Sequence, residues 1–459
     1  MGDTTQNPPL MPVEKFLDIN KREYEMLLRA EKNKKSAALS LVPEKINSPQ
    51  MLPTSNMDQF RDQLNNPNKH YSHFGAPGVA ADTGNKIVRV HKNLIISFSS
   101  DSTGCGHIRN IFPLTYMNAV FAKSKTLRTT IIPFFYYQHE MLMQARTLFF
   151  PRTMSEEYRI AVRRYKDMQP RYGYRMVYDI DDFVWQGDAV GERIPEYNFG
   201  SRNIPKEAIE TVVSIMEMMD VVCISTNFLK NYIIEKLKIK KPMIVLPNAV
   251  PRYFYGPNRR PPIKERLRIP KFIYTGSPTH YDNDNKLKGD FENSWLEFIL
   301  KNVTDKKIEF MVMGCAPSPQ GLVVPWFFEP IKHLIHPVGW LNSYQYHLPI
   351  LEYQPDFSIA PLVPNYFNYS KSDIRYIETC AFGAVFMGTT FTNEMPSPYD
   401  TASVTFPDNC KVEDIEKKVD ELCNPEVFNK IIRQQYDYMD NNGRWMEDEK
   451  YINLLTRIF

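Results

Sequence analysis

A lysine, a serine and a glutamate lie close together in the last quarter of the sequence, at spacings that could bind an anion rich in hydroxyl groups. Lys371 and Ser372 stand where we expect an amphipathic helix to begin, after a loop over 367–370, and Glu378 lies about two turns further along. The backbone N–H groups and the dipole of a helix N-terminus favour an anion, and a lysine adds a charge for phosphate. A carboxylate accepts hydrogen bonds from two neighbouring hydroxyls. The stretch fits a diphosphate on Lys371 and a ribose on Glu378, although a capped surface helix would show the same residues.

Three aspartates follow a short apolar stretch in the first half of the chain. Asp179, Asp181 and Asp182 come at the end of the strand that we expect over 176–180. Crowded carboxylates raise one another's pKa values, which suits a general base that works near neutral pH. The same D-x-D spacing offers hard oxygen ligands to a divalent metal. Capping of the next helix, or pairing with the arginines just upstream, explains the pattern equally well.

A glycine-containing loop follows another expected strand, over 272–275. Gly276 allows the backbone to approach a ligand closely, and Ser277 and His280 can donate hydrogen bonds to phosphate oxygens. Lys286 and Lys288 could add positive charge to the same place. This loop therefore predicts a second contact with the phosphates of the ligand.

A basic segment extends from Val120 to Arg175. It contains eleven Lys or Arg against four Asp or Glu, a local net charge of +7 in a chain whose total is +3. Aromatic residues alternate with these cations, so one face could bind a polyanion through its phosphates and stack on a displaced base. Most charge runs are only solvated surfaces. The arginines that we expect to contact an acceptor are Arg109, Arg163, Arg164 and Arg171.

The elements that must position these residues alternate between strands and helices. Apolar, β-branched strands separated by helical segments predict an α/β fold with parallel sheets. With 459 residues the chain is too long for one core. We expect an N-terminal accessory arm (1–90), a first Rossmann-like domain (91–250), a linker (251–270) with five prolines, a second Rossmann-like domain (271–425) and C-terminal helices (426–459).

The composition limits the class of protein. Hydrophobic residues make up 43% and charged residues 24%, as in a soluble globular protein. We see no apolar run of the roughly 20 residues that a transmembrane helix needs, and no secretory signal, so we expect a cytoplasmic location. The six cysteines are scattered without a C-x-x-C pair, which favours reduced structural thiols over a disulfide framework or a zinc site.

Taken together, these motifs resemble those of nucleotide-sugar glycosyltransferases of the GT-B fold, as found in bacteria and tailed phages. The resemblance spans about residues 93–459. It implies two facing Rossmann-like domains, with the acceptor bound by the first, the donor nucleotide by the second, and the C-terminal helix crossing back to the first. The residues that carry it are Gly104–Arg109, Tyr178–Trp185, Leu246–Asn248, Tyr274–His280 and Phe367–Glu378.

The resemblance also implies roles for individual residues. Lys371 and Ser372 would bind the donor diphosphate and Glu378 the ribose, while Gly276, Ser277 and His280 would line the phosphate side. UDP is the commonest nucleotide in such proteins, and no tightly bound cofactor is expected. No metal-binding residue is assigned, and metal dependence stays open. Retaining members often carry two glutamates spaced E-x7-E, but here Ser370 occupies the first position. In an inverting reaction the base would be Asp181, Asp182 or His107, although His107 also fits a loop histidine bonded to backbone.

Three predictions of the function remain open, two of which differ in the acceptor. The basic segment favours 5-hydroxymethylcytosine in the double-stranded DNA of a phage, with the protein then located in the host cytoplasm. A rival enzyme would transfer sugar to a cell-surface polysaccharide or a lipid-linked sugar, with the cations and aromatic residues against an anionic membrane. A third prediction is a non-catalytic sugar-nucleotide-binding protein.

Overall fold

The computed structural model describes residues 92–459, except for 100–105, 122–123, 125, 134–138, 154, 185–205, 256–258, 277–279, 282, 284–285 and 320. The predicted N-terminal arm thus lies outside the described residues. By its contacts the chain divides into one unit made of Met1–Lys92 and Phe135–Gln144, and a second made of Asn93–Phe134 and Ala145–Phe459. Of the first unit, α5 (His139–Gln144) is the described element. The second unit contains both sheets.

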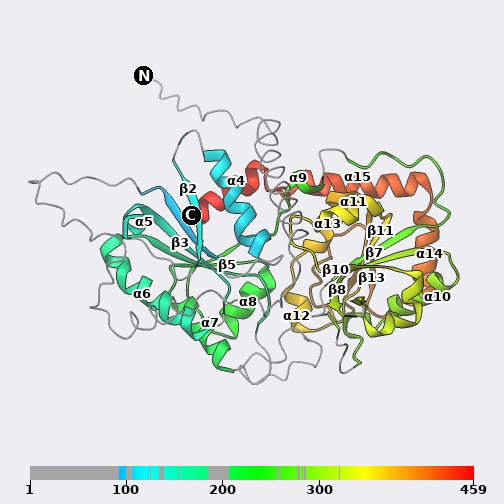
Figure 1. Cartoon of the computed structure of the whole chain (residues 1–459), viewed down its shortest axis with the longest axis horizontal. Helices are drawn as coiled ribbons and strands as arrows, with labels where there is room; N and C mark the ends of the chain where they lie inside the picture. Colours follow the sequence, from blue (N-terminus) through cyan, green and yellow to red (C-terminus); the bar gives the residue numbers. More distant parts are fainter. Residues whose placement is uncertain are drawn as a thin grey trace, which may run out of the picture. The chain divides into compact units, whose positions relative to one another are not determined.

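The first sheet has six strands in the order β2-β1-β3-β4-β5-β6, and all of them run parallel (Figure 1). The order reverses between β1 and β3. Ligands of parallel α/β sheets bind at the carboxyl ends of the strands on either side of such a reversal. The strands are β1 (Leu94–Ser99), β2 (Arg128–Pro133), β3 (Ala145–Pro151), β4 (Arg175–Ile180), β5 (Val221–Ile224) and β6 (Met243–Val245).

Helices cover both faces of this sheet because neighbouring residues of its strands point to opposite sides. Phe150 stacks on Phe98 and contacts Tyr165 of α6, whereas Phe149 contacts Phe459 at the C-terminus. Ser155 caps the start of α6, and a left-handed Gly173 ends it. The helical elements around the sheet are η1 (His107–Ile111, a π-helical turn), α4 (Phe112–Phe121), α6 (Glu156–Tyr172), α7 (Lys206–Met218), α8 (Asn227–Glu235) and α16 (Glu449–Ile458).

The second sheet has the strand order β10-β8-β7-β11-β12-β13, with β9 added as an antiparallel partner of β8. Apart from β9 its strands are parallel. The order reverses between β7 and β11, as in dinucleotide-binding domains. The strands are β7 (Lys271–Thr275), β8 (Glu309–Ser318), β9 (Gly321–Val323), β10 (His336–Gly339), β11 (Phe357–Ala360), β12 (Val385–Thr390) and β13 (Thr405–Pro407).

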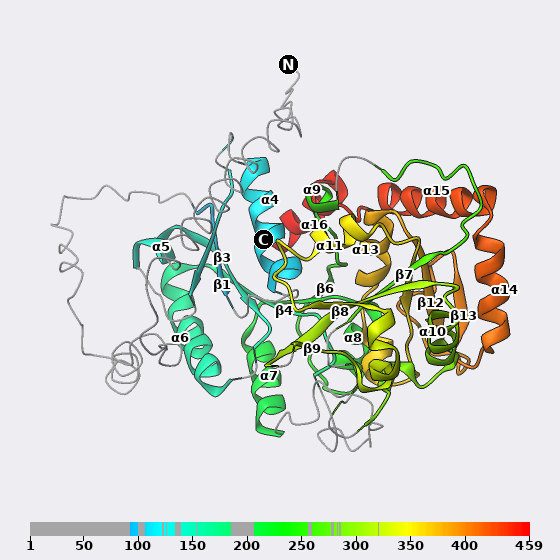
Figure 2. The same cartoon turned by 45° about the vertical axis from the view of Figure 1, so that its right-hand side comes forward.

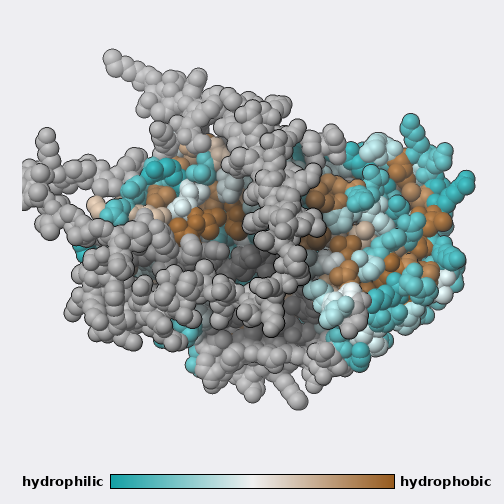
Figure 3. All heavy atoms as spheres, viewed as in Figure 1, coloured by the Kyte–Doolittle hydropathy of each residue, from teal (hydrophilic) through white to brown (hydrophobic). Residues whose placement is uncertain are grey.

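Two apolar layers enclose the second sheet. Phe272 and Tyr274 pack among residues of α10 and α14, whereas Ile273 belongs to a separate cluster with α11. Figure 2 shows α10 and α14 together beside the strands, and Figure 3 shows hydrophilic residues around smaller hydrophobic areas on these elements. The helical elements are η4 (Gly289–Phe291), α10 (Ser294–Thr304), η5 (Trp326–Leu334), α11 (His347–Tyr353), α12 (Tyr366–Ser370), α13 (Ile374–Phe382), α14 (Val412–Leu422) and α15 (Pro425–Asn441).

The fold class predicted from the sequence, α/β with two Rossmann-like sheets, is confirmed. Two local expectations were wrong. The central strand β3 lies inside the segment that we interpreted only as a basic, aromatic-rich face. Residues 367–370, expected as a loop, belong to the short helix α12 (Tyr366–Ser370), which Asn365 caps by accepting a hydrogen bond from the backbone N–H of Asn368.

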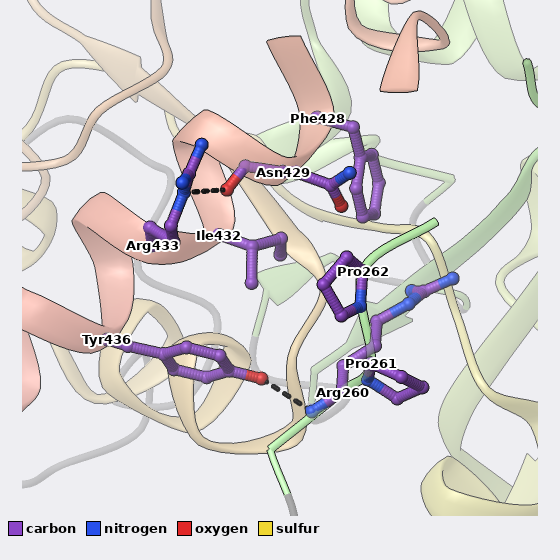
Figure 4. Close-up of a pocket in the computed structure, with 8 residues that line it drawn as sticks. All are labelled: Arg260, Pro261, Pro262, Phe428, Asn429, Ile432, Arg433 and Tyr436. Carbon is purple, nitrogen blue, oxygen red and sulfur yellow. Dashed lines mark hydrogen bonds between the residues drawn. The ribbon is translucent and has the colours of Figure 1, made fainter. Parts of the chain in front are cut away.

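The segment joining the sheets is firmly packed in its second half. It begins with α9 (Arg252–Tyr255). Arg260 forms an ion pair with Asp356, and its backbone N–H donates to the Tyr436 hydroxyl of α15 at 2.8 Å. A surface cavity of about 200 Å³ lies between Pro261, Pro262 and α15 (Figure 4). Because Arg260 already bonds Asp356 and the Pro355 carbonyl, this cavity is best explained as a gap in the packing of the linker.

The C-terminal residues contact the first sheet. Thr147 of β3 donates to the carbonyl of Phe459 at 2.9 Å, and Arg175 of β4 donates to that of Ile458 at 3.0 Å. Before reaching the sheet, this returning segment pairs with the linker, since Val250 forms a backbone bridge with Trp445. The two passages between the sheets are therefore joined by main-chain hydrogen bonds.

Candidate functional site

The carboxyl ends of β7 and β11 define the candidate site. They flank the strand reversal of the second sheet, where ligands of such folds bind. Gly276 follows β7 directly, and a side chain there would collide with the ring and hydroxyl of Tyr274. The packing of Tyr274 therefore requires a glycine at position 276, and the close approach of a ligand there stays a prediction. Ser277 lies outside the described residues.

His280 forms the middle of a buried chain of polar groups. Its Nδ1 lies 2.5 Å from Asp290 Oδ2, and its Nε2 lies 2.7 Å from a guanidinium nitrogen of Arg375. Because a guanidinium only donates, Nε2 must accept and Nδ1 must carry the proton that is donated to Asp290. Burial, together with the charges of Arg375 and Lys371, lowers the pKa of His280 to about 3, so the ring is neutral.

This arrangement changes the role expected for His280. The sequence analysis gave it a hydrogen bond to phosphate, but both of its ring nitrogens are bonded to protein groups here. In this structure it orients Arg375, a residue of α13 that the sequence analysis did not select. The signal was available, since Arg375 stands four residues after Lys371 and three before Glu378, at helical spacing.

Lys371 and Ser372 lie in the connection between α12 and α13, just before Asp373, the N-cap residue of α13. The first sheet's loops hold this connection from both sides. Thr226, after β5, donates to the Ser370 carbonyl at 3.0 Å, and Asn248, after β6, donates to the Ser372 hydroxyl at 2.7 Å. The Lys371 ammonium lies 4.0 Å from the centre of the Phe367 ring.

Glu378 is half-buried on α13 beside two tyrosines. Its Oε1 accepts a hydrogen bond from the Tyr255 hydroxyl at 3.3 Å, and Tyr346 also donates to the carboxylate. Burial raises the pKa of Glu378 to about 7, while Tyr255, Arg375 and Tyr346 act in the opposite direction. Tyr255 belongs to α9, so a contact from the linker reaches the residue that we expect to bind ribose.

Asp181 and Asp182 follow β4 and share one cation, Arg152. The guanidinium lies 3.1 Å from Asp182 and 3.8 Å from Asp181. Burial, reinforced by neighbouring carboxylates, raises the pKa of Asp181 despite Arg152. Burial also opposes ionisation of Asp182, yet Arg152 and Lys371 keep its pKa below the ordinary value. The charge of Lys371 therefore reaches a carboxylate of the first sheet.

Arg109, expected to contact an acceptor, is instead part of the core. It forms a bidentate ion pair with Asp179, at 2.5 and 3.0 Å, and both side chains are 3% exposed. It also donates to the carbonyl of Leu246 and to Asn248 Oδ1. The prediction of an acceptor contact is corrected because the guanidinium is buried and occupied by these internal partners.

His107 is buried in the π-helical turn before α4. Its ring contacts those of Phe112 and Tyr344, with centroids 5.1 and 5.2 Å away. An aromatic surround of this kind is more typical of a packed histidine than of a general base that meets solvent. The possible catalytic role of His107 stays a prediction.

The basic segment contains fewer available groups than its sequence suggests. Arg163 and Arg171 are exposed on α6, and Arg164 is half-buried. The aromatic residues that alternate with these cations, as far as they are described, lie in the core and cannot stack on a displaced base. These residues are Phe149, Phe150, Tyr158, Tyr165, Tyr172 and Tyr174.

The described residues contain no cluster of three or more His, Cys, Asp or Glu side chains placed to hold a metal ion. Asp179, one of the three aspartates considered for a metal, has both carboxylate oxygens bonded to Arg109. In the same part of the chain, no helix is long and apolar enough to span a bilayer.

Sequence comparisons find neither a matching family model nor a matching curated protein. Solved structures do resemble the chain. Sucrose-phosphate synthase from Thermosynechococcus elongatus is 10% identical, with a TM-score of 0.49 over 80% of this chain and 98% of its own. HepE from Anabaena, solved with UDP and glucose, is 7% identical, with a TM-score of 0.48 over 79% and 97%. A UDP-GlcNAc 2-epimerase from Methanocaldococcus jannaschii is 10% identical, with a TM-score of 0.40 over 80% and 99%. Likenesses this distant do not decide the reaction, which has to be judged from the residues of the site.

Proposed function

We propose that this chain is a nucleotide-sugar-dependent glycosyltransferase of the GT-B type, which transfers a sugar, with UDP as the favoured nucleotide, to an acceptor hydroxyl. One observation carries the proposal. The connection that bears Lys371 is hydrogen-bonded to the first sheet's loops through Thr226 and Asn248. A cation suited to a diphosphate therefore acts on Asp182, one of the two neighbouring carboxylates suited to a hydroxyl acceptor.

The donor half of the reaction follows from charge. As the bond between sugar and diphosphate breaks, negative charge grows on the leaving diphosphate, and a fixed lysine ammonium lowers the barrier by stabilising that charge. Lys371 is suited to this role because Phe367 and the bonded residues on either side of it limit its movement. Glu378, once ionised, accepts from the two ribose hydroxyls and fixes the nucleotide.

The acceptor half needs a group that can take up a proton. Asp181 is the better candidate of the two aspartates, since its pKa is raised towards neutrality whereas that of Asp182 is lowered. Asp182 is then the partner that keeps Arg152 in place. Ser370 has no carboxylate, and its buried hydroxyl donates to the Phe367 carbonyl, so we assign it no catalytic role.

For the acceptor, 5-hydroxymethylcytosine in duplex DNA remains the prediction to test first. Its support from the structure is now limited to surface charge, chiefly Arg163 and Arg171 of α6. If these residues bind phosphates, duplex affinity should fall steeply with salt, and changing both to glutamine should reduce the log–log salt slope by about 2. An unchanged slope would argue against duplex DNA as the acceptor and would favour a polysaccharide or lipid-linked acceptor.

The decisive experiment is a screen of nucleoside-diphosphate sugars for release of the nucleoside diphosphate, with mass analysis of the sugar product. Lys371→Ala should reduce turnover about 10²–10³-fold, while Lys371→Arg should keep part of it. Lys418→Ala, a change to a lysine paired with Glu421 on α14, is the matched control. An altered nucleotide sugar without release would indicate an epimerase. Binding without either product would indicate a non-catalytic protein.

A further inference from the structure

Arg375 is a buried cation with an unused hydrogen-bond donor. The residue is only 9% exposed, and its Nη1 has no partner at hydrogen-bonding geometry among the described residues, although the guanidinium also interacts with the Tyr274 hydroxyl. Leaving a buried donor unpaired destabilises a folded protein, and more so when the group is charged. Such a residue is expected where something else, a ligand, completes its bonding.

The orientation of this guanidinium is fixed from behind. Its Nη2 donates to His280 Nε2 at 2.7 Å, and His280 in turn donates to Asp290 at 2.5 Å. Asp290 is held by the Asn368 side-chain amide at 2.7 Å. A chain of three buried polar groups that ends in one unpaired N–H is a positioning device for that N–H.

The groups beside Arg375 suit an anion. The guanidinium carbon lies 5.2 Å from the centre of the Tyr274 ring, and Arg375 also interacts with the Tyr274 hydroxyl. Because a guanidinium only donates, the proton of that buried hydroxyl still has no acceptor among the described residues. That hydroxyl lies in the space that a side chain at position 276, just after β7, would occupy. The charge of Lys371 acts on both His280 and Asp290, so a second cation lies nearby.

We propose that Arg375 Nη1 and the Tyr274 hydroxyl bind an oxygen of the donor's diphosphate, alongside Lys371, and that Asp290 and His280 position Arg375 for this contact. The assignment rests on the proposed function, because it names the part of the same ligand that Arg375 contacts. It also replaces the direct phosphate contact expected of His280 by an indirect role.

Binding of UDP and of uridine, measured by calorimetry, tests this contact because only UDP carries the phosphates. Tyr274→Phe keeps the ring and removes only the hydroxyl, and it should weaken UDP about 2- to 10-fold. Arg375→Gln should weaken UDP about 10- to 100-fold. Uridine affinity should stay unchanged in both. Arg260→Gln, which breaks a partly buried arginine–aspartate pair in the same domain, is the control for lost stability.

The outcomes separate the inference from the function on which it rests. Equal weakening of UDP and uridine, or no weakening of either, in Arg375→Gln and Tyr274→Phe would show that the pair is structural and overturn the inference. If Arg375→Gln does not fold, the ratio measured for Tyr274→Phe decides alone. If the parent protein binds UDP and the diphosphates of the other common donors no better than their nucleosides, the proposed function itself fails.

Discussion

Replacing Arg109 with methionine removes a guanidinium that donates to three partners inside the first domain. The change leaves the Asp179 carboxylate, the Leu246 carbonyl and Asn248 Oδ1 without that donor in a place from which water is excluded. Breaking a buried ion pair on one side costs about 3–5 kcal/mol, because the remaining charge stays buried and uncompensated. For a unit of 150–250 residues each kcal/mol corresponds to about 2–4 °C, so the first unfolding transition should fall by about 6–20 °C.

Differential scanning calorimetry measures this transition, and two further variants make it specific. Arg159→Met breaks a surface pair with Glu156, whose side chain is 54% exposed, and should cost about 0–1 kcal/mol. The double change Arg109→Met with Asp179→Leu should recover much of the lost stability, since an apolar pair of similar volume replaces a buried ion pair well.

The alternative outcome is equally clear. If Arg109 belonged to an acceptor site, Arg109→Met would leave the transition within about 1 °C of the parent and weaken acceptor binding instead. A small shift in the single variant, or a double variant no more stable than the single, would refute the assignment of Arg109 to the core.

Three other predictions follow from contacts at the candidate site. Burial raises the pKa of Glu378 from 4.5 to about 7, so between these pH values the folded chain retains a proton that the unfolded chain loses. This carboxyl therefore lowers the free energy of unfolding as pH rises through that window. Glu378→Gln should therefore gain about 1–2 kcal/mol at pH 8, less than the full shift because the side chain is only half-buried, and nothing at pH 4.5, as checked by urea denaturation. Gly276→Ala forces the Tyr274 ring to move and should cost about 1–3 kcal/mol in the same assay, whereas an unchanged midpoint would mean that the loop yields freely. Ser372→Ala removes the acceptor used by Asn248 and should lower kcat/KM for the donor about 5-fold. Ser318→Ala, which removes a surface hydroxyl bonded to the Gly321 carbonyl, is the control. Equal kinetics for the two variants would argue against positioning of Lys371 by the first sheet.

The sequence was sufficient for the fold class because hydrophobic periodicity reports the burial of whole elements. It failed at β3, where Arg146 and Arg152 flank Phe149 and Phe150 and make a central strand look like a charged, aromatic surface. A strand covered on both faces shows no alternation of polar and apolar residues, so composition alone cannot separate it from a surface segment. The mistake carried into the acceptor prediction, which used these aromatic residues.

Individual roles were harder to predict than the placement of motifs. Local spacing selected Lys371 and Glu378 as candidates, and they lie on one connection and the helix that follows it, while their roles stay predictions. The contacts of Arg109 with Asp179, and of Arg375 with His280, join residues that are 70 and 95 positions apart in the chain. No local pattern encodes such pairs, so a buried arginine and an exposed one look alike in a single sequence.

The docking of the last residues on the first sheet has a consequence for dividing the protein. Expressed alone, residues 1–255 would expose the surface around Thr147 and Phe149 that Phe459 normally covers. Expressed alone, residues 259–459 would carry the apolar face of α16 with no sheet to receive it. When the two fragments are produced together, they should associate through that helix. A chain divided between Tyr255 and Arg259 could therefore serve as a split reporter.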